Sequence, residues 1–276
     1  MDFSRSRDRV SRFEFLDEAA STNDELVERA IGVDASAWGD FSVLVTDNQT
    51  MGRGRLGRTW MAPEGKSLAT SVLLRPAGLS VERFGWLPLI AGAALTGAIH
   101  DVVAPFEHAR TDVEDGTTAE LPVELKWPND VLIAGYKVCG ILAELLPGGQ
   151  GVVMGAGLNL ALDEHDLPTL TSTSILLATG EAPDPDVVLA GYLGRFRELY
   201  ERFVAADGDP FASGIHAAVT RVCGTLAAEV RVELPGGSEL YGTAVEIDSD
   251  GRLVVVNREN GQTLAVAAGD VTHLRY

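Results

Sequence analysis

Apolar runs divide most of the chain into short strands and a few helices. Runs of roughly four to eight apolar residues bounded by turn residues are typical of strands, and apolar positions at a spacing of three to four are typical of helices. The strands predicted in this way lie at 41–46, 67–74, 122–126, 130–133, 136–146 and 152–158. The helices predicted in this way lie at 22–30, 83–103 and 186–205. Consecutive short strands after residue 121 favour a mixed or antiparallel sheet flanked by helices, which is an α+β fold.

The last fifty or so residues have a different pattern. Short alternating strands are predicted at 229–234, 239–247, 253–256 and 263–266. Turn signals that recur every 8–12 residues favour a small β-barrel. We therefore expect two domains, residues 1–224 and residues 225–276.

The longest apolar stretch, 86–99, ends at His100 and contains Pro88. It is too short to span a bilayer and predicts a buried helix instead. The N-terminus has charges but no following apolar run, so no signal peptide is expected, and the predicted location is the cytoplasm. The polar segment 107–121 predicts a mobile acidic loop.

The chain has 276 residues and a formal net charge of −18. This acidity argues against binding to nucleic acids or anionic membranes, because both are polyanions. Lysine is rare and occurs only at positions 66, 126 and 137, so each lysine is a candidate for a specific role. Cys139 and Cys223 are too few and too far apart for a disulfide framework or a zinc site, and we expect both to be buried apolar residues.

A glycine–arginine loop, 52–58, follows the strand at 41–46. Its Gly-x-Gly-x-x-Gly spacing matches a dinucleotide-binding motif, but Pro63 and Gly65 prevent the helix that this motif requires. A phosphate-binding P-loop ending at Gly65-Lys66-Ser67 also fails, because its first glycine would fall on Trp60. Arginine presents a rigid fork that suits phosphate and carboxylate oxygens. The loop therefore predicts an anion site.

Three further clusters carry candidate chemistry. In Lys126-Trp127-Pro128-Asn129-Asp130, a lysine at the end of a strand can act as a point charge on a phosphate or carboxylate. The spacing of Thr22 and Glu25 is that of a helix-capping box, which alone would explain it. Gly155 and Gly157 predict either a backbone against which a flat ligand packs or a simple bulge.

Together these residues resemble the biotin protein ligase family. The resemblance covers almost the whole chain and rests on five motifs in the family's order: Ser21-Thr22-Asn23, Gln49 with 52–58 and Trp60, Lys126 to Asp130, 140–144, and 155–159. It implies a catalytic domain like that of class II synthetases and biotin–lipoate ligases, with an SH3-like C-terminal domain. It also implies that ATP, with Mg²⁺, activates biotin to biotinyl-5′-adenylate, and that one lysine of a biotin carboxyl carrier protein then receives the biotinyl group.

The resemblance also implies roles for individual residues. Lys126 and Arg55 would be catalytic, with Lys126 neutralising the biotin carboxylate and the α-phosphate oxygens. Ser21, Thr22, Asn23 and Gln49 would bind the ureido head of biotin. The remaining substrate-binding residues would be Gly52, Arg53, Gly54, Arg58, Trp60, Gly140, Gly155, Gly157 and Asn159, with Trp60 and Asn159 near the adenine. The glycine-rich loop would be poorly ordered without ligand and would close over the adenylate.

Alternatives stay open. A lipoate ligase or octanoyltransferase would share the core, and a non-catalytic ligand-binding regulator would use the β domain to bind a partner. Too few residues precede Ser21 for a helix-turn-helix domain, so no repressor role is expected. Leu56 stands where many relatives have a basic residue. The metal ligands are not identified, and both a monomer and a homodimer are compatible with the sequence.

Overall fold

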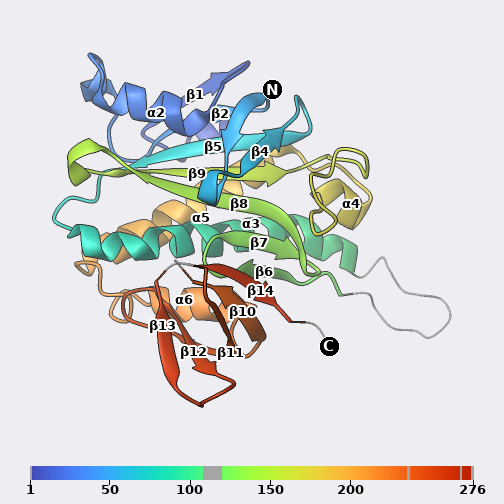
Figure 1. Cartoon of the computed structure of the whole chain (residues 1–276). Coiled ribbons are helices and arrows are strands. Elements are labelled where there is room, and N and C mark those ends of the chain that lie inside the picture. The colour runs from blue at the N-terminus through green and yellow to red at the C-terminus, as the bar shows by residue number, and fades with distance from the viewer. Residues whose placement is uncertain (1, 108–119, 235–236, 268, 275–276) are drawn as a thin grey trace.

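The protein is described by a computed structural model that covers residues 2–107, 120–234, 237–267 and 269–274. Most of the predicted acidic loop at 107–121 lies outside these described residues. A large mixed sheet occupies one half of the molecule, and a smaller antiparallel sheet occupies the other (Figure 1). Two long helices run between the two sheets in this view.

The large sheet has seven strands, and its order shows how distant segments meet. The order is β1 (Arg12–Leu16), β2 (Ser42–Thr46), β5 (Ser67–Leu74), β9 (Val152–Asn159), β8 (Tyr136–Leu145), β7 (Asp130–Ile133) and β6 (Val123–Lys126). β1 and β2 are parallel and all other neighbours are antiparallel, which confirms the predicted mixed sheet. β1, a five-residue strand at the edge of the sheet, was not predicted from the sequence.

Helices cover both faces of this sheet, and the alternation along β2 shows why. Val43 and Val45 point into the main core, whereas Leu44 points into a second cluster with Leu26. This is the period of two expected for a strand that is buried on both faces. The helices are α1 (Ser4–Arg7), α2 (Thr22–Ile31), α3 (Leu87–Glu107), α4 (Ile175–Thr179), α5 (Pro185–Ala205) and α6 (Ile215–Val222). The second cluster lies under α2, and the main core contains apolar residues of α3 and α5.

α3 is the central core helix. With the 3₁₀ segment Val81–Trp86 before it, the helical run is longer than the apolar stretch predicted, so the argument from length against a membrane span was wrong. Within the described residues, Val81–Phe106 is the one helix that is long and apolar enough to cross a membrane. However, 67% of its most apolar window is buried inside the protein, as in the core helix of a folded domain. The predicted buried helix is therefore confirmed.

The C-terminal sheet is antiparallel and has five strands. Their order is β13 (Thr263–Val266), β12 (Leu253–Asn257), β11 (Glu239–Ile247), β10 (Glu229–Glu233) and β14 (Asp270–His273). Within the described residues the edge strands β13 and β14 do not pair, so the predicted closed barrel is corrected to an open sheet. β14 was not predicted, because Val271 is the one apolar residue among its four and leaves no alternation to detect in the sequence.

Indole side chains attach the C-terminal sheet to the larger half of the molecule. Trp86 donates a hydrogen bond of 2.9 Å from Nε1 to the Ser249 carbonyl, and Trp127 donates one of 3.0 Å to the Gly251 carbonyl. Both indoles are almost completely buried. The two sheets also share one hydrophobic core, so the C-terminal sheet is fixed against the segment that follows Lys126.

The glycine–arginine segment forms a hairpin rather than a loop. β3 (Gln49–Arg53) and β4 (Thr59–Ala62) pair with each other, and a 3₁₀ turn over Arg55–Gly57 joins them. The turn places Leu56 at φ 57° and leaves its side chain exposed. The predicted loop is thus confined to the tip of the hairpin.

Candidate functional site

A cavity of about 690 Å³ lies between the β3–β4 hairpin, the large sheet and β14. Most of the residues singled out in the sequence line it, although they come from segments far apart in the chain. They are Ser21, Thr22, Asn23, Gln49, Arg53, Gly54, Arg55, Arg58, Trp60, Lys126, Gly140, Gly155 and Gly157. This convergence identifies the cavity as the candidate active site.

Two predicted residues do not line the cavity. The Asn159 side chain is buried and donates a hydrogen bond of 2.9 Å to the Thr173 carbonyl. Gly52 is buried within the hairpin, where a Cβ would lie 2.3 Å from Gln49 Nε2 and 2.4 Å from the Trp60 carbonyl oxygen. The structure therefore places Gly52 beside two lining residues rather than in the lining itself.

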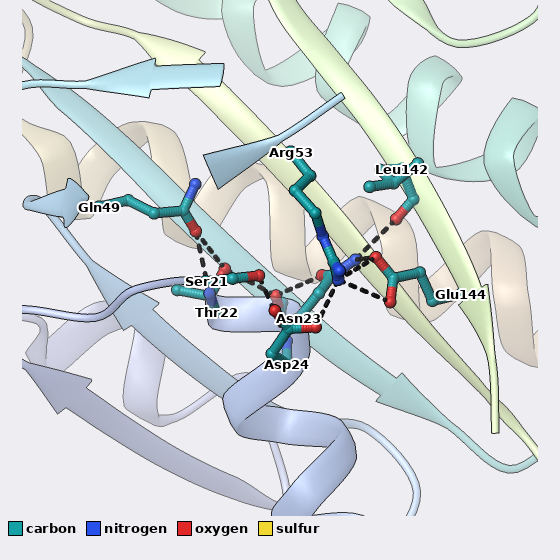
Figure 2. Close-up of polar contacts among 9 residues, drawn as sticks. Ser21, Thr22, Asn23, Asp24, Gln49, Arg53, Leu142 and Glu144 are labelled. Carbon is teal, nitrogen blue, oxygen red and sulfur yellow. Dashed lines mark hydrogen bonds and ion pairs between the residues drawn. The ribbon is translucent and has the colours of Figure 1, made fainter. Parts of the chain in front are cut away.

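The start of α2 forms the polar end of the cavity (Figure 2). Ser21 is the N-cap of α2, and its hydroxyl accepts a hydrogen bond from the Asp24 amide. The predicted Thr22–Glu25 capping box is therefore corrected by one residue. Thr22 donates hydrogen bonds from its amide and its hydroxyl to Gln49 Oε1, at 2.9 and 3.2 Å. These contacts fix the Gln49 amide and leave its Nε2 without a hydrogen-bond partner among the described residues.

Asn23 is held by three neighbouring groups. Its Nδ2 lies 3.3 Å from both the Leu142 carbonyl and Glu144 Oε1, and its Oδ1 accepts a hydrogen bond of 2.7 Å from the Ser71 hydroxyl. All of these partners belong to the sheet, so α2 begins against the strands β5 and β8. This network fixes the orientation of the polar groups at this end of the cavity.

Two glycines of β9 allow side chains to lie directly on the strand. A Cβ at Gly155 would lie 2.4 Å from Asn23 Oδ1, and one at Gly157 would lie 2.2 Å from Trp60 Cε2. Their pairing with β5 and β8 is regular, so a bulge, which the sequence left open, is excluded. The flat group packed on the backbone is the Trp60 indole. Its Nε1 is buried without a partner among the described residues, and a ligand acceptor would satisfy it.

Carboxylates or amides hold each arginine of the hairpin. Arg53 forms ion pairs with Asp24 and Glu144, the latter at 3.0 Å (Figure 2). Arg55 donates a hydrogen bond of 2.8 Å to Asn129 Oδ1, and Arg58 forms an ion pair with Asp270 of β14. Partial burial lowers the pKa of the Arg55 guanidinium, and the nearby Asp130 and Asp270 only partly offset that effect.

Lys126 ends β6 and faces the same cavity. In contrast to Arg53 and Arg58, it forms no ion pair with any residue in the described part of the chain. Burial lowers the pKa of its ammonium group, with the charges of Asp130 and Asp270 acting in the opposite direction. An ammonium group that is partly desolvated and has no paired carboxylate is arranged to receive an external anion.

Sequence reasoning missed several lining residues. Lys137 forms an ion pair of 2.7 Å with Asp130, and its ammonium lies 5.6 Å from the centre of the Trp60 ring. The scarcity of lysine marked Lys137 as a candidate, but nothing in the sequence assigned it a role. The segments 168–172 and 270–273 also contribute to the lining, but no motif marked them.

The remaining lysine and the two cysteines lie outside the cavity lining. Lys66 is bound to Asp163 and Asp166, at 3.1 and 2.5 Å. Cys139 and Cys223 are buried and free, and burial raises the pKa of both thiols. This confirms the expectation of inert, apolar cysteines.

The carboxylates that line the cavity in the described part of the chain are Asp130 and Asp270. No group of three or more potential metal-ligating side chains occurs among the described residues, so they do not form a complete protein cage for a metal ion. Mg²⁺ bound to ATP keeps several waters and needs only one or two carboxylates besides the phosphates. The residues present therefore fit an ion that arrives with the nucleotide.

Comparison with known proteins agrees with this geometry. Residues 21–159 match the sequence model described as the "Biotin/lipoate A/B protein ligase family", and residues 228–274 match the "Biotin protein ligase C terminal domain". The fold and the site thus define a ligase that acts on a small carboxylic acid, and the chain belongs to the biotin/lipoate protein ligase family.

Within this family, the chain is similar to several individual biotin ligases. The chain is 36% identical over 260 residues to the biotin–[acetyl-CoA-carboxylase] ligase of Mycobacterium tuberculosis, covering 94% of this chain and 87% of the relative. It is 30% identical over 254 residues to the enzyme of the same name from Paracoccus denitrificans, covering 90% and 95%. The biotin protein ligase from Aquifex aeolicus in complex with biotin and ATP has a TM-score of 0.71 and 27% identity, covering 96% of this chain and 100% of that one.

Proposed function

We propose that this protein is a biotin–[acetyl-CoA-carboxylase] ligase. It joins biotin to ATP, giving biotinyl-5′-adenylate and pyrophosphate, and then transfers the biotinyl group to a lysine of a biotin carboxyl carrier protein. The observation that carries the proposal is the position of Lys126, an ammonium group without an ion-pair partner among the described residues, in a cavity lined by arginines and amide groups. The matched relatives with the same named activity support it.

Lys126 brings two anions together in the first step. The biotin carboxylate attacks the α-phosphate, so negative charge meets negative charge and more charge develops on the phosphate oxygens. A fixed cation at this point offsets the repulsion and stabilises the transition state without having to reorganise. Lys126 is accordingly assigned to the chemical step, and Arg55, the second predicted catalytic residue, is assigned to retention of the adenylate.

The polar end at α2 binds the biotin head. Gln49 Nε2 is free to donate a hydrogen bond to the ureido carbonyl, because its Oε1 is already held by Thr22. Ser21 and Asn23 offer further polar atoms on the same wall. Because neighbouring hydrogen bonds fix these groups, the head is oriented with little loss of side-chain entropy.

The hairpin binds the adenylate. Arg53, Arg55 and Arg58 extend from one turn toward the cavity, and closure of this hairpin would exclude water that hydrolyses the intermediate. Trp60, packed on Gly157, offers a ring surface and a free N–H to the adenine. Asn159 is less suited to this role, since its amide is bound to Thr173.

In this proposal Asp130 would be the protein carboxylate that holds the Mg²⁺ ion of the ATP complex. The bound ion would supply positive charge to the pyrophosphate leaving group. Asp130 lies on the same segment as Lys126 and Asn129, at the start of β7. Lys137 neutralises this carboxylate in the ligand-free protein.

The choice between biotin and lipoate rests on the C-terminal domain. The family that matches residues 21–159 includes both kinds of ligase, whereas residues 228–274 match a domain described for biotin protein ligase. The test is pyrophosphate exchange into ATP, measured with biotin or lipoate as the acid. We expect exchange with biotin alone. Exchange with lipoate but not with biotin would reverse the assignment.

We also propose the acceptor, the cellular location and the oligomeric state. The acceptor is the carrier domain of a carboxylase, and the enzyme acts in the cytoplasm as a monomer or a homodimer. The net charge of −18 disfavours any nucleic-acid partner. It also weakens long-range attraction to an acidic carrier, so docking would depend on short-range contacts.

A further inference from the structure

Asp270 places a carboxylate in the lining of the cavity, where phosphates are expected. It lies at the start of β14, on the open edge of the C-terminal sheet. The assigned chemistry of biotin activation gives it no role. Its contacts show what a carboxylate does at this position.

Asp270, the first residue of β14, and Gly269, which directly precedes it, hold two arginines of the hairpin. The Asp270 carboxylate forms an ion pair with the Arg58 guanidinium, and the Gly269 carbonyl accepts a hydrogen bond of 3.1 Å from Arg55 Nη2. The other terminal nitrogen of Arg55 is bound to Asn129. The hairpin tip is therefore attached to the C-terminal sheet on one side and to the segment after Lys126 on the other.

β14 is itself fixed in place, so it can serve as an anchor. His273 Nε2 lies 3.0 Å from Thr225 Oγ1, and that hydroxyl accepts a hydrogen bond of 3.0 Å from the Trp127 amide. Backbone pairing with β10 runs from Val230 to Glu233. Through Thr225, these hydrogen bonds connect β14 to Trp127, the residue that follows Lys126.

The charges around Asp270 keep it ionised. Burial acts to raise the pKa of this carboxyl, but the hydrogen bond and charge of Arg58, with the charges of Lys126 and Arg55, outweigh it and lower the pKa. The Arg58–Asp270 pair is partly exposed, with 62% and 33% of the two side chains accessible. Partly exposed ion pairs contribute little stability, so a phosphate can displace one partner at low cost.

We propose that Asp270 is a positioning residue that holds Arg58 across the cavity in the ligand-free protein and gives it up to the phosphate of the nucleotide. The Gly269 carbonyl holds Arg55 in the same way. The C-terminal sheet therefore affects nucleotide binding through the hairpin, because Asp270 must release Arg58 before this guanidinium can bind the phosphate. This inference rests on the anion-binding role proposed for the hairpin.

The test is a double-mutant cycle read by hydrogen exchange of residues 53–58. The proteins are wild type, Asp270→Asn, Arg58→Gln and the double variant, each without ligand and with biotin plus ATP. Glu239→Gln is the matched control, because it removes one charge from the same sheet where Glu239 pairs with Arg231. Pyrophosphate exchange gives the KM for ATP in parallel.

Without ligand, we expect Asp270→Asn to speed exchange of the hairpin amides roughly two- to fivefold, as for loss of one partly exposed ion pair. The double variant should exchange no faster than either single variant. With biotin and ATP the effect of Asp270→Asn should vanish, and its KM for ATP should fall because the competing carboxylate is gone. The control should match wild type throughout.

Three results would overturn the inference. They are unchanged hairpin exchange in ligand-free Asp270→Asn, equal acceleration with and without ligand, or a raised KM for ATP like that of Arg58→Gln. Failure of the biotin ligase assignment looks different. In that case biotin and ATP would leave hairpin exchange unchanged even in the wild type, whereas the ligand-free comparison would still report on the Arg58–Asp270 contact.

Discussion

The two cationic regions of the cavity differ in how their charges are held. Lys126 ends a strand of the large sheet, is partly buried and has no carboxylate in ion-pair contact among the described residues. The arginines of the hairpin lie on a two-stranded projection, and both Arg53 and Arg58 are paired with carboxylates. One region therefore presents a fixed charge, and the other presents charges that must first exchange partners. This difference separates a residue for the chemical step from residues for binding and closure.

Replacement of Lys126 should have the largest effect. Lys126→Ala is expected to lower biotin-dependent pyrophosphate exchange by about 10²–10³-fold, because it removes the fixed charge that stabilises the transition state. The matched control is Lys66→Ala, since Lys66 is paired with Asp163 and Asp166 away from the cavity lining. Near-normal exchange in Lys126→Ala would refute the assignment, provided that circular dichroism shows a folded protein.

Replacement of Arg55 should have a smaller effect of a different kind. Arg55→Ala is expected to release biotinyl-5′-adenylate to solvent roughly tenfold faster, because a charge-assisted hydrogen bond to the phosphate contributes about 1.5–3 kcal/mol. Release can be followed by the adenylate recovered in a filtrate after a single turnover. If Arg55→Ala lost the exchange reaction as completely as Lys126→Ala, the contrast between the two regions would fail.

Replacement of Gly157, which lies under the Trp60 indole, tests the packing of the cavity wall. Gly157→Ala places a Cβ 2.2 Å from Trp60 Cε2, so the indole must move. Overpacking of this kind costs about 1–3 kcal/mol and should lower Tm and weaken nucleotide binding. The control is Gly39→Ala, where a Cβ meets nothing within 4 Å. Equal melting temperatures for the two variants would show that Trp60 does not lie on the strand.

The pH dependence of pyrophosphate exchange should show the smallest of these effects. Because burial lowers the pKa of Lys126, its positive charge is lost at a lower pH than in an ordinary lysine, and exchange activity should fall as the solution becomes alkaline. The contribution of Lys126 to the free energy of unfolding changes with pH in the opposite direction to the activity. Its unfolded form binds more protons, so stability rises as pH rises from the folded toward the unfolded pKa.

Arginine keeps its proton at higher pH, which provides a check on this assignment. Any activity remaining in Lys126→Arg should persist to a higher pH than in the wild type. The measurement is the pH profile of pyrophosphate exchange for both proteins. Coincident alkaline limbs would mean that another group controls the decline.

The sequence predicted those features that depend on local pattern. The strands around Lys126, the start of α2 at Thr22 and the glycines of β9 all lie where periodicity and turn residues placed them. The partners of the arginines could not be predicted in this way. Asp24, Glu144 and Asp270 are distant in sequence from the hairpin, and only the folded chain brings them to it.

The C-terminal sheet also has features that the local sequence pattern did not predict. Its other four strands were predicted, whereas β14 was missed and the barrel was expected to close. Yet β14 contributes Asp270 to the cavity and is the strand that contacts the hairpin. A segment with a single apolar residue, such as β14, does not stand out in the sequence, because tertiary contacts rather than local propensity specify it.

The measurement that tests the central claim most directly is a mass spectrum of a biotin carboxyl carrier domain after incubation with this protein, ATP, Mg²⁺ and biotin. The claim predicts that the wild type adds one biotinyl group to one lysine of the carrier. It also predicts that Lys126→Ala adds almost none in the same time and that Lys66→Ala behaves like the wild type. An unmodified carrier with the wild type, or equal modification by Lys126→Ala, would contradict it.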